Sequence, residues 1–434
     1  MHESSPPPVP SFGEALRFWS KLGWISFGGP AGQTAIMHKE IVERRRWLSE
    51  DHFLHALNFC MLLPGPEAQQ LATYLGWRLH GARGGIAAGV LFVLPSVFIL
   101  LGLSWLYMAG GSIVWVDGIF YGLMAAVIAI VASAVKRIGS KALKSPILWV
   151  VAGLSFLAIF AFKISFVIII LAAAGIGFVG GKFYPRQFTA GKGHGKSAAV
   201  ELSAVVLPPA SQASLRRTVL ISGICVTLWW TPVLAIGWWM GWGSIYFQEG
   251  LFFSKAALVT MGGAYAVLPY VSQMAVENGW LAQRQMMVGL GLAETTPGPL
   301  IMVLQFIGFV AAWQKPGDLP PLLAATLGAL ITTWVTFLPC FLFVFLGAPH
   351  VEGLRSRPGL ASALTAITAA VVGVILNLAI WFAWHALVPG GGRIDYFVAV
   401  IAISAWLAME RFKIGVIPTL AACAVLGMAW KWVS

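Results

Sequence analysis

Long apolar segments, separated by short polar stretches, run through the whole chain. Residues 91–107, 119–135 and 360–387 are the clearest examples. Each has at least the roughly 17 residues that a helix needs to cross a bilayer. Other apolar segments are broken in the middle by glycine and proline, which ordinarily interrupt a helix. The pattern predicts an all-α membrane protein that passes through the bilayer many times.

The breaks recur in a fixed order. Pro64-Gly65-Pro66 appears again as Pro297-Gly298-Pro299, 233 positions later, and a Trp-Leu pair stands 17 residues before the first proline of each motif. Upstream of each motif lies another break, at Gly28-Gly29-Pro30 in one case and at Gly262-Gly263-Ala264 in the other. Three matches in register indicate an internal duplication. Two homologous halves with matched breaks in apolar segments are typical of secondary transporters.

The duplication divides the chain into four parts. We expect an N-terminal repeat at 1–181, a polar cytoplasmic linker at 182–217, one connecting membrane helix at 218–247, and a C-terminal repeat at 248–434. Each repeat contains six apolar segments, two of them broken, so thirteen segments are predicted in a six, one, six arrangement. Whether the broken segments cross the membrane or re-enter on the same side stays open, because both arrangements place the following loops on the same faces.

Composition and charge restrict the class of protein and set its orientation. With 59% hydrophobic and 10% charged residues, the chain is not an ordinary soluble protein. The net charge of +12 comes from residues between the apolar segments, which fits the positive-inside rule and not a nucleic-acid-binding face. If the basic stretches 136–144 and 182–217 are cytoplasmic, the connecting helix makes the second repeat begin on the opposite face. The two repeats are therefore expected to be inverted in the lipid bilayer.

The broken segments form the candidate substrate site. An unpaired backbone group in hydrocarbon is costly, so a broken helix persists only where it is buried or lines a polar cavity. A helix that restarts after a break presents free N–H groups and the positive end of its dipole, which favour a small oxyanion. A kink or a close-packing point is the alternative for each break. The predicted substrate-binding residues are Gly28, Gly29, Pro30, Gln33, Thr34, Pro64, Gly65, Pro66, Gln69, Gln70, Gly262, Gly263, Tyr265, Thr295, Thr296, Pro297, Gly298 and Pro299.

Four charged residues within or near the breaks are candidates for coupling and for attracting the anion. Glu294 and Glu67 lie inside the repeated motifs, where an ionisable residue is a functional candidate by default. Each is a candidate for carrying a coupling proton, the alternative being a protonated structural carboxyl group. Lys21 and Lys255 each stand seven residues before the first glycine of a break and would help to attract an anion. Snorkelling to the lipid headgroups is the alternative for both lysines.

No catalytic residues, cofactor or metal ion are expected. The sequence has no HExxH motif and no Asp-rich prenyltransferase motif, and no nucleotide-binding domain that would drive a pump. A channel would also use broken helices, and only a flux measurement separates it from a carrier. The cysteines stand singly in apolar segments and are expected to be buried thiols, neither metal ligands nor disulfides: Cys60, Cys225, Cys340 and Cys423.

Taken together, these motifs resemble the signatures of the chromate ion transporter family, in its long, two-domain form. The resemblance covers nearly the whole chain. Glu67 departs from the family pattern, in which a small or apolar residue is commoner at this position. The motifs that carry the resemblance are Phe27-Gly28-Gly29-Pro30, Leu62-Leu63-Pro64-Gly65-Pro66 followed by Gln70 and Tyr74-Leu75-Gly76, Gly262-Gly263-Ala264-Tyr265, and Glu294-Thr295-Thr296-Pro297-Gly298-Pro299.

Membership of that family implies secondary active export of chromate from the bacterial cytoplasm across the inner membrane, by antiport driven by the proton gradient, and hence chromate resistance. The residues by themselves indicate only an inverted-repeat transporter of a small anion. Sulfate is a tetrahedral dianion of similar size and charge, so a transporter or channel for sulfate or another small oxyanion is the alternative. A homodimer is compatible with this organisation, and the sequence does not specify the oligomeric state.

Overall fold

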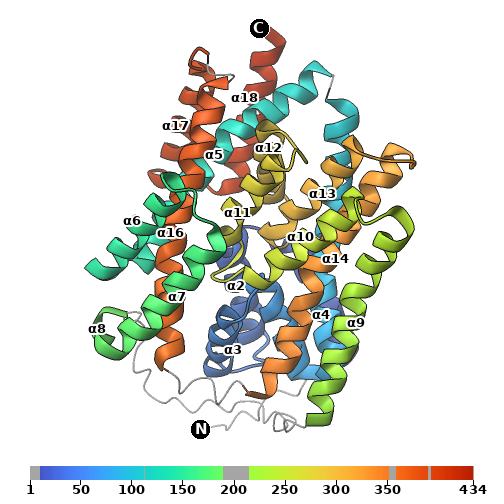
Figure 1. Cartoon of the computed structure of the whole chain (residues 1–434), viewed down its shortest axis with the longest axis vertical. Coiled ribbons are helices and arrows are strands. Elements are labelled where there is room, and N and C mark those ends of the chain that lie inside the picture. Colours follow the sequence, from blue (N-terminus) through green and yellow to red (C-terminus); the bar gives the residue numbers. More distant parts are fainter. Residues whose placement is uncertain (1–9, 112, 189–214, 351–357, 390–391, 434) are drawn as a thin grey trace.

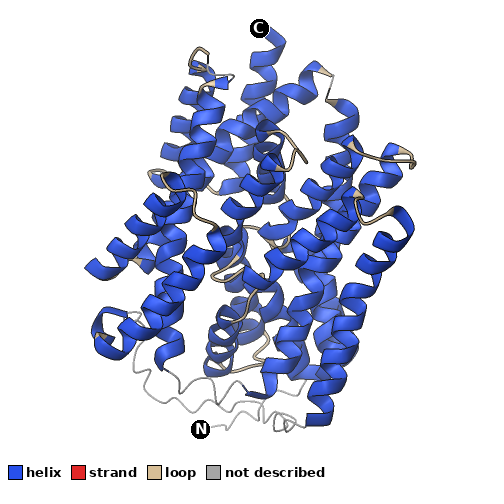
Figure 2. Cartoon of the chain, viewed as in Figure 1, coloured by secondary structure: helices blue, strands red, loops and turns tan. Residues whose placement is uncertain are grey.

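The computed structural model describes residues 10–111, 113–188, 215–350, 358–389 and 392–433. All regular secondary structure among these residues is helical, as Figure 2 shows. Seven of the helices are long and apolar enough to cross a membrane. The prediction of an all-α membrane protein with many passes is therefore confirmed.

The helices follow the predicted order of two repeats joined by a connecting helix. The N-terminal repeat contains α1 (Phe12–Ile25), α2 (Gly29–His38), the π-helix η1 (Lys39–Arg44), α3 (Glu50–Leu62), α4 (Glu67–Gly110), α5 (Val114–Ala142), α6 (Pro146–Phe160), α7 (Phe166–Phe183) and α8 (Pro185–Phe188). The connecting helix is α9 (Leu215–Met240). The C-terminal repeat contains α10 (Ile245–Val259), α11 (Ala264–Glu277), α12 (Gln283–Thr295), η2 (Leu300–Met302), α13 (Val303–Gln314), α14 (Pro321–Gly347), η3 (Ala348–His350), α16 (Pro358–Leu387), α17 (Tyr396–Glu410) and α18 (Val416–Val433). Most of the predicted linker, residues 189–214, lies outside the described residues.

α4 consists of two antiparallel helices joined by a tight turn. Residues 80–81 leave the helical conformation, and the two parts touch at Gly76 and Gly84, where any side chain would meet the facing backbone. In the C-terminal repeat, the loop between α13 and α14 replaces this turn, and Gly308 and Gly328 make the same close contact. Small residues of this kind allow two membrane helices to pack with their backbones in contact.

The broken segments of the N-terminal repeat re-enter the membrane instead of crossing it. Glu14 at the start of α1 pairs with Arg45, beyond the end of α2, at 3.4 Å. His38 at the end of α2 lies 2.5 Å from Glu50 at the start of α3. The turn within α4 in turn contacts the carbonyl group of Pro10, just before α1. The hairpin α1–α2 and the hairpin formed by α3 and the first part of α4 therefore begin and end on one face, the lower face in Figure 1.

The broken segments of the C-terminal repeat re-enter from the opposite, upper face. Tyr246 in the first turn of α10 donates a hydrogen bond to Pro316 O, beyond the end of α13, at 3.0 Å. Gln314 at the end of α13 donates to Gln285 at the start of α12 at 3.1 Å. Figure 1 shows α2 and α3 in the lower centre of the molecule, with α11 and α12 above them. The question that the sequence left open is thus answered: all four broken segments are re-entrant hairpins.

Another pair of hairpins shows the same inversion. The turns of α6–α7 and α17–α18 contain the same tripeptide, Phe-Lys-Ile, at 162–164 and at 412–414. Its lysine has a positive φ in both turns, 51° at Lys163 and 57° at Lys413. α6 begins beside α8 on the lower side of the molecule, whereas α17 begins at the upper face (Figure 1). The inverted duplication therefore includes the outer helices as well as the broken ones.

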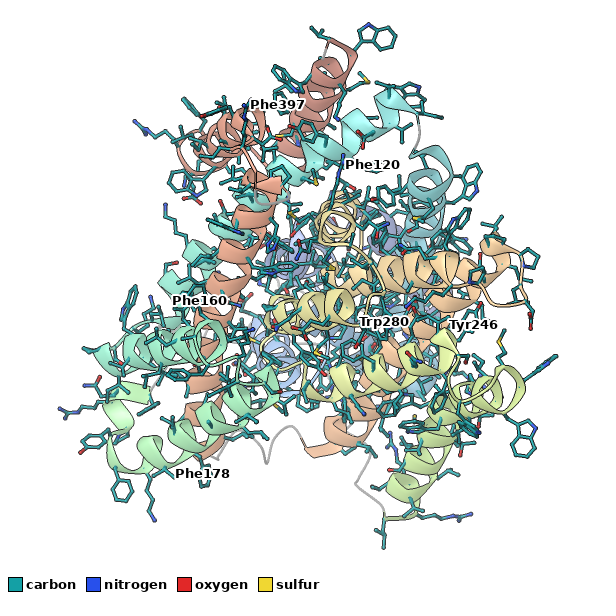
Figure 3. The ribbon with its side chains drawn as sticks, turned by 45° about the horizontal axis from the view of Figure 1, so that its top comes forward. Phe120, Phe160, Phe178, Tyr246, Trp280 and Phe397 are labelled. Atoms are coloured by element: carbon teal, nitrogen blue, oxygen red, sulfur yellow. The ribbon has the colours of Figure 1, made fainter. Side chains whose placement is uncertain are left out.

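The long helices divide into interior and peripheral ones. In the most apolar 18-residue stretch of α5, 72% of the residues are buried, whereas in the corresponding stretch of α9 only 17% are buried. Exposed aromatic side chains such as Phe178 of α7 lie at the periphery, as Figure 3 shows. Such residues face lipid in a membrane protein, because hydrocarbon solvates them as well as a protein core does. α9 thus connects the repeats along the outside of the bundle.

Candidate functional site

The tips of the four re-entrant hairpins meet and are hydrogen-bonded crosswise. The N–H group of Gly65 donates to Thr260 O at 2.6 Å, and the N–H group of Gly298 donates to Ser26 O at 2.8 Å. Each Pro-Gly-Pro motif is thus bonded to the first break of the other repeat. We call this set of residues the tip junction: 26–28, 64–66, 260–263 and 297–299.

Side chains from both repeats reinforce the tip junction. Gln33 of α2 donates through Nε2 to Gly298 O, in the other repeat, at 2.5 Å. Ser96 of α4 donates through its hydroxyl group to Pro297 O. These bonds satisfy carbonyl groups that the broken helices leave free, which is a requirement inside a bilayer. Gln33 is one of the predicted site residues, whereas Ser96 escaped prediction because it lies in an unbroken apolar segment.

Glycine is required at the centre of both Pro-Gly-Pro motifs. Gly65 and Gly298 have φ values of 125° and 104°, which side-chain-bearing residues rarely adopt. A Cβ atom on Gly298 would overlap Ser96 Oγ, and one on Gly65 would lie 2.8 Å from Cys340 Sγ. Conformation and space therefore exclude a side chain at each motif, and the two hairpins approach each other backbone to backbone.

The helices that begin at the tip junction start without a side-chain cap. Gly28, Pro66, Gly263 and Pro299 precede α2, α4, α11 and η2, and none of them accepts a hydrogen bond from the following turn through its side chain. Away from the junction, α1, α3, α10 and α17 are each capped by a serine or aspartate side chain, whereas α5, α6, α7 and α14 also start without a side-chain cap. Uncapped helix starts leave N–H groups available and carry a partial positive charge.

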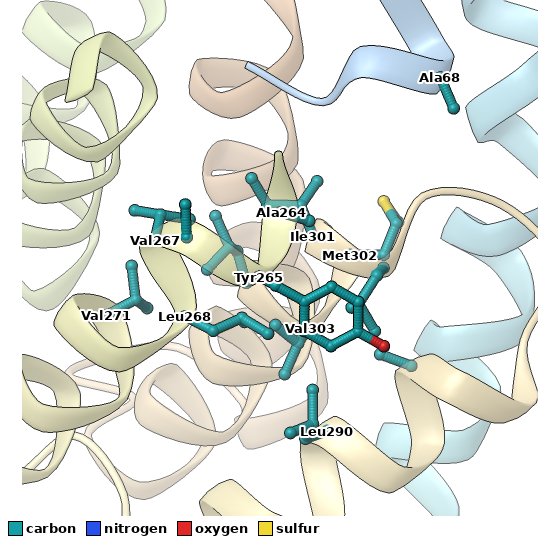
Figure 4. Close-up of a cluster of buried hydrophobic side chains, with 14 of the residues drawn as sticks. Ala68, Ala264, Tyr265, Val267, Leu268, Val271, Leu290, Ile301, Met302 and Val303 are labelled. Atoms are coloured by element: carbon teal, nitrogen blue, oxygen red, sulfur yellow. The ribbon is translucent and has the colours of Figure 1, made fainter. Parts of the chain in front are cut away.

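A tyrosine–carboxyl pair lies beside the junction in the C-terminal repeat. Tyr265 in the first turn of α11 donates its hydroxyl hydrogen to Glu294 Oε1 at 2.6 Å. Both side chains are buried, and the tyrosine ring is surrounded by apolar side chains of α11, α12 and α13 (Figure 4). The guanidinium group of Arg137, on α5, lies 5.8 Å from the centre of the Tyr265 ring. A predicted site residue and a predicted coupling residue are thus in direct contact, with a cation next to them.

Arg137 was not predicted as a site residue. Its neighbours Lys136 and Lys141 made it part of a basic stretch that the charge pattern assigned to a loop. In the structure α5 extends to Ala142, so that Arg137 belongs to a helix and lies over the tyrosine ring. No spacing in the sequence relates this position to Glu294, which belongs to the other repeat.

Glu67, the other predicted coupling residue, also contacts the start of α11. It is the first residue of α4 and is partly buried. A Cβ atom on Gly263 would lie 2.7 Å from Glu67 Oε1, so this carboxyl group lies against the break of the opposite repeat. The two candidate carboxyl groups therefore approach one helix start, that of α11, from the two repeats.

Four of the remaining predicted polar residues are hydrogen-bonded within their own repeat. Thr295 and Thr296 donate to carbonyl groups of α12 at 2.7 Å and 3.0 Å. Gln69 donates to the hydroxyl group of Thr73 at 3.1 Å, Gln70 donates to Pro64 O at 2.7 Å, and Thr34 on α2 is partly buried. Among the described residues, three of the buried amide oxygens have no hydrogen-bond partner: those of Gln33, Gln69 and Gln70.

The two predicted anion-attracting lysines lie on exposed helix faces. Lys21 is exposed on α1 near Trp24, and Lys255 is exposed on α10 near Leu258. Neither forms an ion pair in the part of the chain that the structure describes. A role in attracting the anion stays a prediction for both.

The cysteines are free thiols. Cys60, Cys340 and Cys423 are buried, as expected, whereas Cys225 on the peripheral helix α9 is only partly buried. Within the described ranges, no group of three or more His, Cys, Asp or Glu side chains is arranged to hold a metal ion.

The hairpins of the two repeats are enclosed to different extents. Every residue of α12 from Met286 to Glu294 is buried, whereas Ala31 on α2 and Asn58 on α3 are exposed. The upper face is held by an ion-pair cluster in which Asp117 of α5 contacts Arg284 of α12 at 2.6 Å and Lys431 of α18 at 3.3 Å. The helix α12 is thus more fully enclosed than α2 and α3.

Comparison with known proteins shows which protein family the sequence matches. A family model described as "Chromate transporter" matches residues 13–178 and 247–428, once in each repeat. The chain is 34% identical over 379 residues to a chromate transport protein of Pseudomonas aeruginosa, which covers 86% of this chain and 81% of the relative. It is 30% identical over 408 residues to a chromate transport protein of Cupriavidus metallidurans, covering 94% and 90% of the two chains. A probable chromate transport protein of Synechococcus elongatus is 27% identical over 422 residues, covering 96% and 95%. No solved structure matches the chain.

Proposed function

The chain belongs to the chromate transporter family, and from that premise we propose that it exports chromate from the cytoplasm in exchange for protons. It is a multi-pass membrane protein, and we place it in the bacterial inner membrane with its lower face in the cytoplasm. Arg44, Arg45, Lys182 and Arg217 lie at or next to helix ends of that face, as the positive-inside rule requires. Export would lower the cytoplasmic chromate concentration and so confer resistance.

The tip junction is the proposed anion site, and the convergence of four uncapped helix starts is the observation that carries the proposal. Backbone N–H groups at helix starts bind oxyanions without the desolvation cost of a buried lysine. The junction lies between two inverted repeats, which is where alternating-access transporters bind their substrates. The glycines at its centre allow an anion to approach the backbone closely.

The Tyr265–Glu294 pair is the proposed link between anion and proton. Gain or loss of a proton at Glu294 changes the charge beside the junction by one unit, and this changes the affinity for a dianion. Such a linkage couples the two gradients, because each ligand then alters the affinity for the other. Arg137 would balance the negative charge and orient the tyrosine. Glu67 is the corresponding candidate on the N-terminal side.

The membrane potential favours the proposed direction. Moving one elementary charge through a potential of 100 mV changes the free energy by about 2.3 kcal/mol, so a dianion leaving an inside-negative cell gains about twice that amount. Protons that enter in exchange would add their own driving force. Neither contribution requires ATP.

Uptake of chromate into everted membrane vesicles tests this function. The vesicles are energised with NADH, and uptake is measured with and without a protonophore and with excess sulfate; vesicles without the protein are the control. Uptake that collapses with the protonophore and resists sulfate is the expected result. Uptake that survives the protonophore would indicate a channel or anion exchange, and loss of uptake with sulfate would indicate a transporter of tetrahedral oxyanions in general.

A further inference from the structure

Glu249 is a buried carboxyl group that the proposed anion site does not use. It lies on α10, is 0% exposed, and neither of its carboxyl oxygens has a hydrogen-bond partner among the described residues. An ionised carboxylate without a partner in such a place would cost several kcal/mol. The carboxyl group therefore holds a proton in this conformation.

The carboxyl group occupies a space that glycine provides. A Cβ atom on Gly328 of α14 would lie 3.1 Å from Glu249 Oε2 and would also press on Gly308 of α13. Glu249 is thus inserted at the point where α13 and α14 touch backbone to backbone. Any change in its charge acts directly on the packing of α10 against these two helices, because a charged group there must find water or a partner.

The groups around Glu249 offer no counter-charge. α13 and α14 contain no Asp, Glu, Lys, Arg or His, and the two arginines of α9 lie in its first turn, at the lower face. On α10 itself, the other titratable groups are Tyr246 and Lys255, and Lys255 is exposed. α11 contributes Tyr265, Tyr270 and Glu277.

A cavity of about 590 Å³ opens next to this position at the upper face. It is lined by the loop between α9 and α10, by the first turn of α10 and by the loop between α13 and α14, and Lys315 and Asp318 lie in its wall. Tyr246, one turn before Glu249, also lines the cavity and can be followed in Figure 3. Tyr246 and Gln248 line the cavity and Glu249 does not, so the cavity wall lies within about one helical turn of Glu249 along α10.

α10 also connects Glu249 to the tip junction. The helix ends at Val259, and the next residue, Thr260, accepts the hydrogen bond from the N–H group of Gly65. A movement of α10 therefore changes the hydrogen bond that joins the N-terminal Pro-Gly-Pro motif to the other repeat. α10 alone is therefore sufficient to link Glu249 to the tip junction.

We propose that Glu249 is a proton-binding site of the transport cycle, loaded from the upper-face cavity and coupled to the anion site through α10. This inference rests on the proposed proton-coupled transport and adds a residue to it. When the carboxyl group loses its proton, α10 moves away from the glycine contact of α13 and α14 so that the charge reaches the water of the cavity. Reprotonation returns the helix to the position seen in the structure.

The test uses the purified full-length protein in proteoliposomes and two assays. The first is accumulation of labelled chromate driven by an imposed pH gradient, and the second is exchange of labelled for unlabelled chromate at equal pH on both sides. Glu249→Gln keeps the size and neutrality of the protonated side chain. It is expected to lose pH-driven accumulation by at least about fivefold, the lower end of typical coupling effects, while exchange continues. Glu249→Asp is expected to retain accumulation with a shifted pH dependence.

The matched control is Glu277→Gln, which removes an exposed carboxylate whose partner, Gln273, lies on its own helix. It should leave both assays unchanged. Glu249→Gln with normal pH-driven accumulation would overturn the inference, and so would loss of accumulation and exchange together in both Glu249 variants. Failure of the proposed function gives a different result. The unmodified protein itself would then show no accumulation driven by the pH gradient, whether or not it exchanges chromate.

Discussion

At the scale of single residues, the site depends on the absence of side chains and N–H groups at the hairpin tips as much as on the groups that remain there. Gly65 and Gly298 combine a positive φ with a lack of space for any side chain. Prolines on both sides of each glycine remove N–H groups that would otherwise need partners. What remains at each tip is a bare backbone that another hairpin can approach. The single intact donor of each motif, the glycine N–H, is the group that bonds to the opposite repeat.

Replacing Gly298 by alanine tests this conclusion. We expect Gly298→Ala to destabilise the protein by about 1–3 kcal/mol through backbone strain, to displace Ser96, and to lower chromate transport strongly; Gly298→Leu should abolish it. The measurements are thermal unfolding in detergent and vesicle uptake. Gly279→Ala is the control, because Gly279 has a φ of 62° but open space around it. Equal effects of the two alanine variants would contradict the argument from close approach.

Replacing Glu294 by glutamine tests the link between proton and anion. Glu294→Gln keeps the size of the side chain and an acceptor for the Tyr265 hydroxyl group, but it cannot ionise. We expect normal expression with chromate transport that is lost or no longer responds to pH. Tyr265→Phe removes the hydroxyl group and retains the ring, and it should weaken the pH response less severely. Normal pH-dependent efflux by Glu294→Gln would exclude the proposed role.

At the scale of secondary-structure elements, the re-entrant hairpin is the unit from which the candidate site is built. Each hairpin consists of two helices of about 10 to 15 residues, too short to span a bilayer singly, since spanning takes about 20 residues. Such helices are stable inside the membrane only if the carbonyl and N–H groups at their tips are satisfied. The crosswise bonds between repeats do this, and they also make the position of each hairpin dependent on the other repeat.

Gln33 provides a test of that dependence, because it joins α2 to the carbonyl group of Gly298. We expect Gln33→Leu to leave this carbonyl short of a donor, at a cost of about 1–3 kcal/mol, and to lower transport without preventing expression. Thermal unfolding and uptake are measured together. Gln273→Leu is the control, since Gln273 donates to Glu277 of its own helix. If Gln33→Leu behaved like the control, the hydrogen bond between Gln33 and Gly298 would contribute neither to stability nor to transport.

At the scale of the whole molecule, the two repeats share a fold but differ in enclosure. The upper face is held by Asp117 with Arg284 and Lys431, next to a cavity of about 220 Å³ lined by residues including Phe120. A separate pair, Lys136 with Glu410 at 2.5 Å, joins α5 to the end of α17. Because the repeats are inverted, exchanging their states would open the upper face and close the lower one. Inverted repeats produce alternating access in this way.

Breaking the upper ion-pair cluster should favour the opposite state. We expect Asp117→Asn to increase the rate at which a cysteine placed at Phe120 reacts with a thiol reagent added from the upper face, because Phe120 is buried in the present state. The four native cysteines are removed first. Lys136→Gln breaks the pair between α5 and α17 instead and should not increase the rate. An unchanged rate in Asp117→Asn would mean that the cluster does not hold this face closed.

Much of this organisation could be read from the order of residues. Apolar length predicted the all-helical membrane class, and seven helices among the described residues are long and apolar enough to span, because a bilayer imposes the same requirement on each helix. The repeated Pro-Gly-Pro motifs revealed the duplication, and the odd connecting helix together with the basic stretches implied its inversion. The inner helices restart at or directly after the predicted breaks, since proline and glycine mark helix ends for reasons local to the backbone.

Only the tertiary structure decided which groups meet. Re-entry, the bonds from Gly65 to Thr260 and from Gly298 to Ser26, and the place of Arg137 beside Tyr265 all join residues that are far apart in the chain. The sequence by itself determined helices, breaks and inversion, because these follow from local backbone preference and from the apolar solvent. It could not determine the partner of each break, because a buried hydrogen bond between two hairpins depends on how whole repeats pack against each other.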